Sequence, residues 1–174
     1  MGLIHLHPVI MTQLPSSEYS ISLRAAAPED AEFLYQVYAH TRYQELEHAP
    51  WTPQQVDAFL RMQFQAQATH YQTYYPNTSY DLVLVNGEPA GRLSVSREPG
   101  HLIIMDIAIL PSFRGLGIGT ILLRQTLDEA AAHHQRATIH VEKENPARRL
   151  YERLGFTQIA EDGIYYEMEW KAKE

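Results

Sequence analysis

The sequence predicts a single α/β domain in which a mixed sheet carries helices on both faces. The chain has 174 residues, 45% of them hydrophobic, which is enough for one substantial core. Its apolar runs follow the order strand, two helices, three strands, helix, strand, helix, two strands. Turns containing glycine separate several of these runs. We expect the domain at residues 19–174, preceded by an N-terminal extension at residues 1–18.

The first half of the predicted domain supplies one strand and two helices. The strand covers residues 19–24, where polar and apolar side chains alternate. The first helix begins at Pro28, with acidic residues in its first turn. The second begins at Thr52-Pro53, a cap residue followed by the proline favoured at the first helical position. The aromatic and polar segment 70–76 ends at a turn, and its rings either pack in the core or wall an acceptor pocket.

The second half supplies the remaining strands and helices. A hairpin is indicated by Asn86-Gly87, the favoured two-residue turn between apolar runs. The predicted strands are 80–85, 89–95, 102–110, 137–141, 156–160 and 164–170, and the predicted helices are 121–133 and a short one in the segment that follows Asn145.

The turn 111–120 joins the buried strand at 102–110 to the helix at 121–133. We expect Gly115, Gly117 and Gly119 to allow positive φ and leave no Cβ in the way, so that successive N–H groups close around an anion. The following helix adds unpaired N–H groups and the positive end of its dipole. The predicted ligand is a phosphate or pyrophosphate, and tight packing of helix on strand is the alternative reason for glycine.

Three known phosphate-binding patterns fit this turn poorly. The nucleotide-binding P-loop needs a lysine after its last glycine, and Thr120 stands there. The dinucleotide fingerprint needs a third glycine at the same position. The Gly-x-Gly-x-Gly turn of Rossmann-like methyltransferases does match, but the chain after Thr120 is too short for the rest of a doubly wound sheet.

Arg114, Gly117 and Gly119 form the pattern Arg-x-x-Gly-x-Gly, with a strand before it and a helix after it. Here the sequence resembles the GNAT superfamily of N-acetyltransferases, whose pyrophosphate loop has this form. The segment 145–156 also resembles the family's Asn…Leu-Tyr-Glu-x-x-Gly-Phe segment. The resemblance covers roughly residues 20–170. It implies a mostly antiparallel sheet of about six to seven strands, whose two central strands splay apart after a bulge.

The resemblance implies that acetyl-CoA is the acyl donor. Asn145 matches the position whose side-chain amide bonds the cofactor arm, with a helix cap as the alternative. Arg114 would add charge at the pyrophosphate or lie on the surface. The pyrophosphate would be held by the main-chain amides of Gly115, Leu116, Gly117, Ile118, Gly119 and Thr120. The pantetheine arm would add like a strand to the main chain of Ile107, Ala108 and Ile109.

Tyr151 matches the family's tyrosine that protonates the leaving thiolate, and a core aromatic is the alternative. Many members have one more residue between Asn145 and this tyrosine. The shorter spacing turns the helix start by about 100°, so the two roles need not hold together. His140 occupies a position that holds a catalytic glutamate in some relatives, and an imidazole can accept a proton near neutral pH. Asp106, Glu142, a water chain and a purely structural histidine remain alternatives.

Composition excludes several function classes. The 14 basic and 21 acidic residues give a net charge of −7, which argues against non-specific binding to nucleic acid or an anionic membrane. Cysteine is absent, which rules out disulfides, thiolate metal sites and an acyl-cysteine intermediate. No stretch is long enough to cross a bilayer. The histidine pairs at residues 5 and 7 and at 133 and 134 lack a third ligand, so we expect no metal.

The expected function is transfer of an acetyl group from acetyl-CoA to a primary amine, by direct attack in a ternary complex. The acceptor, a small molecule or a protein, cannot be identified from the sequence. A cytoplasmic location and a homodimer are compatible with these features. The alternatives are a non-catalytic acyl-CoA-binding or sensor module and a methyltransferase-like nucleotide binder.

Overall fold

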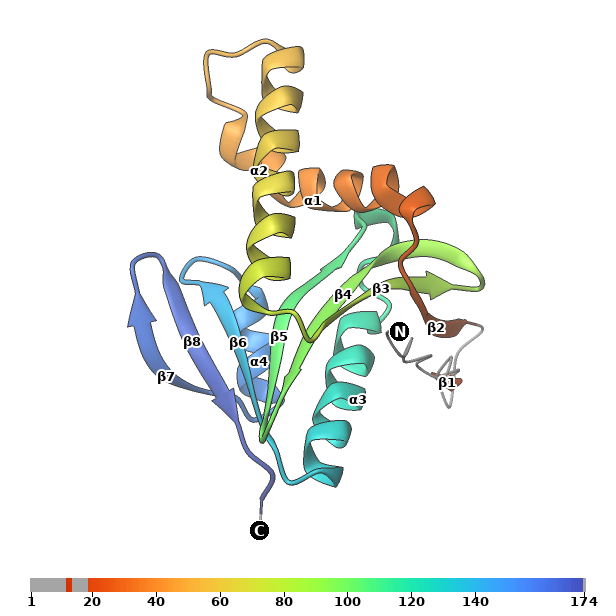
Figure 1. Cartoon of the computed structure of the whole chain (residues 1–174), viewed down its shortest axis with the longest axis vertical. Coiled ribbons are helices and arrows are strands. Elements are labelled where there is room, and N and C mark those ends of the chain that lie inside the picture. The colour runs from red at the N-terminus through yellow and green to blue at the C-terminus, as the bar shows by residue number, and fades with distance from the viewer. Residues whose placement is uncertain (1–11, 14–18, 174) are drawn as a thin grey trace.

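The computed structural model describes residues 12–13 and 19–173, and its strands form one eight-stranded sheet in the order β1-β2-β3-β4-β5-β6-β8-β7 (Figure 1). The parallel pair is β5 with β6, and the other pairs are antiparallel. The strands are β1 (Thr12–Gln13), β2 (Ser20–Ala25), β3 (Thr78–Val85), β4 (Glu88–Glu98), β5 (His101–Ile109), β6 (Arg136–Glu142), β7 (Thr157–Asp162) and β8 (Tyr165–Trp170).

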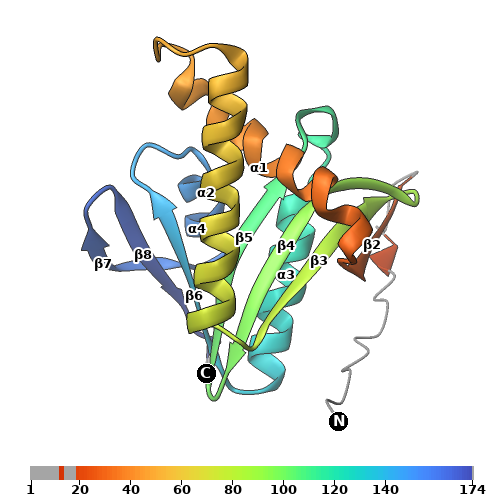
Figure 2. The ribbon, with the colours of Figure 1, turned by 45° about the horizontal axis from the view of Figure 1, so that its top comes forward.

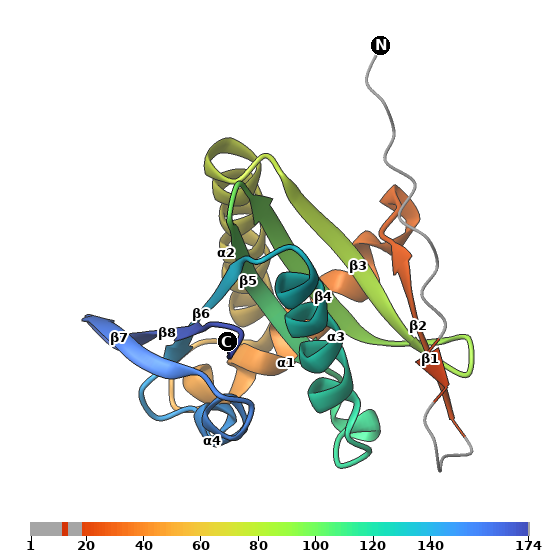
Figure 3. The ribbon, with the colours of Figure 1, turned by 90° about the horizontal axis from the view of Figure 1, so that it is seen from below.

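Helices cover both faces of the sheet. α1 (Ala31–Leu46) and α2 (Pro53–Tyr74) lie on one face, and α3 (Ile118–Ala132) and α4 (Ala147–Arg153) lie on the other (Figures 2 and 3). Short 3-10 turns precede α1 at Pro28–Asp30 and α3 at Pro111–Phe113. Among the described residues, no helix combines the length and apolar character that a membrane span requires.

Two hydrophobic clusters hold these layers together. The larger one packs Leu122 and Leu123 of α3 against strand residues such as Ile104, all nearly inaccessible to solvent. The smaller one joins α1 to α2, where Tyr35 meets Phe64 edge to face at 5.9 Å. α3 therefore buries an apolar face against the sheet, whereas α1 packs against both α2 and the sheet.

The predicted element order is confirmed from β2 to β8. One additional strand, β1, falls within the expected N-terminal extension at residues 1–18, and the rest of that extension lies outside the described residues. The segment 70–76 belongs to α2 as far as Tyr74. The predicted start of a helix at residue 121 is wrong by three residues, because α3 already begins at Ile118.

The two central strands, β5 and β6, diverge part-way along the sheet. They pair from His101↔Arg136 to Ile104↔Ile139, and no further. The next residue of β5, Met105, is the extra residue of a bulge, since Ser94 and Val95 of β4 pair with Asp106 and Ile104. Beyond this bulge β5 stays paired with β4, and β6 with β8. The splayed central strands implied by the family resemblance are thus present.

Candidate active site

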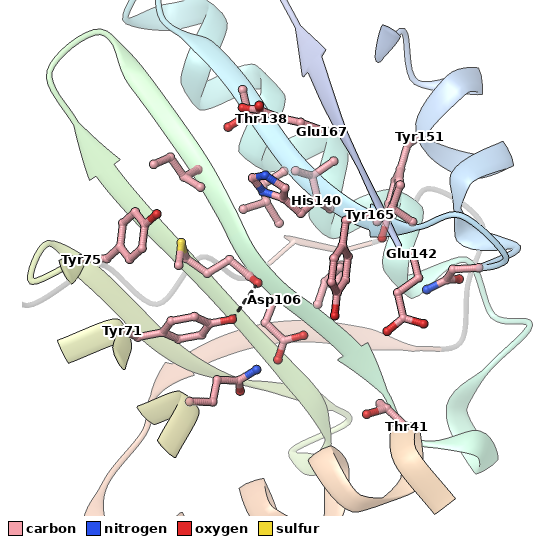
Figure 4. Close-up of a pocket in the computed structure, with 18 of the residues that line it drawn as sticks. Thr41, Tyr71, Tyr75, Asp106, Thr138, His140, Glu142, Tyr151, Tyr165 and Glu167 are labelled. Carbon is pink, nitrogen blue, oxygen red and sulfur yellow. Dashed lines mark hydrogen bonds between the residues drawn. The ribbon is translucent and has the colours of Figure 1, made fainter. Parts of the chain in front are cut away.

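A cavity of about 580 Å³ lies where β5 and β6 part (Figure 4). Side chains from α1, α2, β5, β6, α4 and β8 line it. Those that carry polar groups include Thr41, Arg42, Tyr71, Asp106, Thr138, His140, Glu142, Asn145, Tyr151, Tyr165 and Glu167. The cavity combines acidic, phenolic and imidazole groups with the Arg42 guanidinium, and such convergent polar groups are typical of a ligand-binding site.

The glycine-rich turn lies directly before α3. Gly115 and Gly117 have φ of +79° and +77°, in the left-handed region that glycine tolerates best. Gly119 does not share this conformation, so the expectation of positive φ is wrong there. It lies in the first turn of α3, and a Cβ on it would meet only the Leu150 Cδ2 at 3.9 Å. Neither a left-handed backbone conformation nor a steric clash within the chain therefore requires a glycine at position 119.

The main-chain N–H groups of residues 115–120 point to no acceptor among the described residues. The Ile121 N–H is the first to bond back, to the Gly117 carbonyl at 3.2 Å. Six successive unpaired donors at a helix N-terminus form a site that can bind an anion. Next to them, the Arg114 guanidinium donates through Nε to the Ile109 carbonyl at 3.1 Å, which carries its charge to the end of β5.

The free edge of β5 faces the gap between the central strands. The Leu110 N–H donates to the Ala90 carbonyl at 2.8 Å, which fixes the alternation of hydrogen bonds along this antiparallel pair. By this alternation the main-chain groups of Ala108 face β4, and those of Ile107 and Ile109 face the gap. Two of the three residues predicted to bind a cofactor arm, Ile107 and Ile109, therefore turn their main-chain groups toward the gap. Ala108 does not.

Tyr151 is both a core aromatic and a lining residue of the cavity. Its side chain is 6% exposed and packs against Phe156 with ring centroids 6.0 Å apart. Burial raises the pKa of Tyr151 to about 12, and the nearby negative charge of Asp106 adds to this shift. The phenol consequently keeps its proton at neutral pH and can give it to a stronger base.

Asn145 lies at the start of α4. Its Oδ1 accepts a hydrogen bond from the Ala147 N–H at 2.9 Å, so the side chain does act as a cap. Its Nδ2 has no hydrogen-bond acceptor among the residues described. Asn145 and Tyr151 line the same cavity, so the short spacing between them does not separate the two side chains.

The three candidate bases differ in their partners. His140 is exposed, lies between Thr138 and Glu142 on the cavity face of β6, and has no ion-pair partner in the described part of the chain (Figure 4). Glu142 forms an ion pair with Arg42 at 3.4 Å. Asp106 is ion-paired with the buried Arg92; burial raises the pKa of Asp106, and the charge of Arg92 opposes this shift.

Residues 32–156 match the model of the Acetyltransferase (GNAT) family. The chain belongs to the GNAT family. A 5-NmdU N-acetyltransferase of Pseudomonas phage PaMx11 is 26% identical over 158 residues, which span 86% of this chain and 99% of that relative. A ribosomal protein bS18 alanine N-acetyltransferase of Haemophilus influenzae is 34% identical over 64 residues, 36% of this chain and 44% of the relative.

A solved GNAT structure shows the same fold. The PaiA N-acetyltransferase from Thermoplasma acidophilum in complex with coenzyme A superimposes with a TM-score of 0.67 at 16% identity. The match covers 87% of this chain and 99% of the other. The mixed sheet and helix layers described above are therefore those of the GNAT fold.

Sequence reasoning missed several residues at this GNAT site, some of which line the cavity and one of which pairs with a lining residue. Arg92 is the main one, because it pairs with the lining residue Asp106 and is only 8% exposed. Charged side chains are rarely so buried unless they are paired. The signal that could have found it is an arginine within the run 90–95, whose other residues are small or apolar. Tyr71 was not missed, since it belongs to the segment 70–76 considered for an acceptor pocket; it lines the cavity, and its hydroxyl donates to the Met105 carbonyl at the bulge (Figure 4).

Proposed function

We propose that this GNAT protein is an acetyl-CoA-dependent N-acetyltransferase that acetylates a primary amine by direct attack in a ternary complex. The observation that supports this most strongly is the run of unpaired amides at residues 115–120, which leads to the gap between β5 and β6. The names of the two curated relatives, both N-acetyltransferases, add support.

The residues at this site fit acetyl-CoA. The amides of residues 115–120 would hold the pyrophosphate, with Arg114 as a nearby positive charge. The gap-facing main-chain groups of Ile107 and Ile109, and the free Nδ2 of Asn145, would hold the pantetheine arm. Gly119 would leave room for the ligand over the first turn of α3. When bound, acetyl-CoA supplies an acetyl group activated as a thioester.

The chemistry then requires two proton transfers. The amine nitrogen forms a bond to the acetyl carbon, and the bond from that carbon to sulfur breaks. His140 would take the proton that the amine loses, because both carboxylate alternatives, Asp106 and Glu142, already carry an arginine partner. Tyr151 would give its phenolic proton to the departing thiolate. With no cysteine in the chain, no acyl-cysteine intermediate can form.

Replacing His140 with glutamine is expected to lower kcat by about 100-fold at neutral pH, the lower end of the usual effect of losing a general base. The Kd for CoA should not change, because His140 lies on β6, away from the amides of residues 115–120. Steady-state kinetics and calorimetry measure the two quantities. The control is His133→Gln, at the exposed C-terminal end of α3. Full kcat in His140→Gln would mean that water or a carboxylate takes the proton.

The proposed function is tested by incubating the full chain with acetyl-CoA and a panel of amines. The panel should include polyamines, aminoglycosides, amino acids and peptides with a free N-terminus. Free thiol reports turnover, and mass spectrometry identifies the acetylated product. Binding of CoA without thiol release for any amine would favour the alternative, a non-catalytic acyl-CoA-binding module.

A further inference from the structure

A second, smaller cavity adjoins the first. It has a volume of about 240 Å³ and lies between α1, α2 and the strands β3 to β5. The two cavities share the lining residues Gln67, Tyr71 and Asp106. Figure 4 shows Tyr71 beside Asp106 at this common wall. The smaller cavity thus opens beside the point where the central strands part.

The helices and the sheet give this cavity two different sides. Its helix side is mixed: Leu34 of α1 and Phe64 and Ala68 of α2 form an apolar wall, and Gln67, Tyr71 and Gln72 of α2 add polar groups beside it. Its sheet side carries Tyr80, Arg92 and Ser94. The register pairs Tyr80 with Ser94, and Ser94 with Asp106, so these side chains share one face of the sheet. The apolar part of the helix side therefore faces a polar floor on the sheet side.

The polar floor presents hydrogen-bond donors without acceptors. The Arg92 Nε is buried and faces the Asp106 carboxylate, and its guanidinium lies over the Tyr38 and Phe64 rings, 5.5 and 5.9 Å from their centroids. No hydrogen bond joins its two terminal nitrogens to a described residue other than Asp106. The Tyr80 hydroxyl is fully covered and makes no hydrogen bond of good geometry in the described part of the chain, although the Thr78 side chain lies close to it. Ser94 is 5% exposed and adds a third group that can donate. Since buried polar groups normally have partners, these donors indicate a ligand group that accepts hydrogen bonds.

A carboxylate is the group that fits this floor best. The terminal nitrogens of arginine form a planar fork that binds two carboxylate oxygens at once. Arg92 and Asp106 are the charged side chains that face the cavity from its described walls. Asp81 also lines it, but its register partner Leu93 packs in the core with α3, so the Asp81 side chain points to the opposite face. One positive and one negative group side by side match a zwitterion.

On the basis of the proposed function, we propose that the amine acceptor is an α-amino acid with an apolar side chain. Its carboxylate would bind Arg92, Tyr80 and Ser94. Its amino group would lie beside Asp106, next to the strand gap where acetyl transfer takes place. Its side chain would pack against the apolar wall formed by Leu34, Phe64 and Ala68. The volume of the smaller cavity suits a ligand of this size, because pockets for drug-sized molecules begin at roughly 300 Å³.

The test compares leucine with 3-methylbutylamine, which is leucine without its carboxylate. With saturating acetyl-CoA, kcat/KM should be about 100-fold higher for leucine than for 3-methylbutylamine. This factor corresponds to the free energy lost when hydrogen bonds to a charged group are removed. Calorimetry in the presence of CoA should show leucine binding and much weaker binding of the amine. This second readout does not depend on turnover.

Two variants locate the effect at the floor of the cavity. Tyr80→Phe removes a hydroxyl that makes no hydrogen bond of good geometry in the described part of the chain, so folding should be preserved, and leucine binding should weaken by about tenfold. Arg92→Lys keeps a cation against Asp106 but loses the planar fork, and should weaken leucine binding by about tenfold or more. In both variants the ratio of kcat/KM for leucine to kcat/KM for 3-methylbutylamine should fall, because only leucine carries the carboxylate. Tyr43→Phe, on the exposed part of α1, is the control.

The outcomes separate this inference from the proposed function. If leucine does not bind, or is acetylated no better than 3-methylbutylamine, the inference is overturned, and acetylation of any other amine leaves the proposed function standing. If leucine binds but no amine is acetylated, the proposed function fails, and the role of leucine as acceptor fails with it.

Discussion

Replacing Tyr151 with phenylalanine is expected to lower kcat by about 10²- to 10⁴-fold, the usual contribution of a general acid. The substitution removes only the hydroxyl, so the ring keeps its packing against Phe156. The Kd for CoA should stay within about twofold, because the pyrophosphate site lies on the loop before α3. Pre-steady-state and steady-state thiol release measure the effect.

The raised pKa of Tyr151 also predicts an alkaline effect. A phenol whose pKa is about 12 in the folded protein and about 10 unfolded stabilises the fold fully below pH 10. This stabilisation is lost as the pH rises through about 12. Tyr151→Phe should therefore lose less stability between pH 10 and 11.5 than the natural chain.

The control for the effect of Tyr151→Phe on kcat is Tyr74→Phe, because Tyr74 is 68% exposed on α2. A Tyr151→Phe kcat within twofold of the natural value would contradict the assigned role.

Replacing Gly119 with glutamate is expected to weaken CoA binding by at least about 100-fold. A carboxylate about 4 Å from a phosphate repels it by roughly 4 kcal/mol at the effective dielectric constant of a protein surface. The fold should not suffer, since Gly119 is helical and a Cβ has room there. Glutamate in the first turn of a helix is in fact favourable, so the melting temperature should hold or rise.

Gly119→Gln is the matched control, because it has nearly the same shape without the charge. It should weaken binding by about tenfold, through lost space alone. Calorimetry with CoA and thermal unfolding measure binding and stability on the same samples. Equal CoA affinity in the natural chain and Gly119→Glu would show that no phosphate lies over the first turn of α3.

The sequence signals that succeeded are local ones. Thr52 and Gln55 form a reciprocal capping box that starts α2, with hydrogen bonds of 3.2 and 2.9 Å. Asn86-Gly87 makes the turn between β3 and β4, and both residues have positive φ. The predicted start of α3 is wrong because Gly117, in a left-handed conformation, acts as its N-cap, four residues before the apolar spacing that begins at Ile121. A left-handed residue at the start of a helix produces no periodic pattern of apolar residues in the sequence.

The candidate site was only partly predictable. Residues in short motifs, such as Asn145 and Tyr151, could be placed by resemblance, and the structure brings both to one cavity. The pairing of Arg92 with Asp106 depends on the register of β4 and β5 around the bulge. The smaller cavity depends on how α1 and α2 pack over that register, so neither could be read from spacing along the chain.

The most direct test of the account is an NMR titration of the ¹⁵N-labelled chain with CoA. The amide resonances of residues 115–120 should shift together and more than any others, and the amides of Ile107 and Ile109 should follow. The same titration of Gly119→Glu should produce no shifts at concentrations that saturate the natural chain. Binding of CoA that leaves the amides of residues 115–120 unchanged, or no binding by the folded chain, would contradict the account.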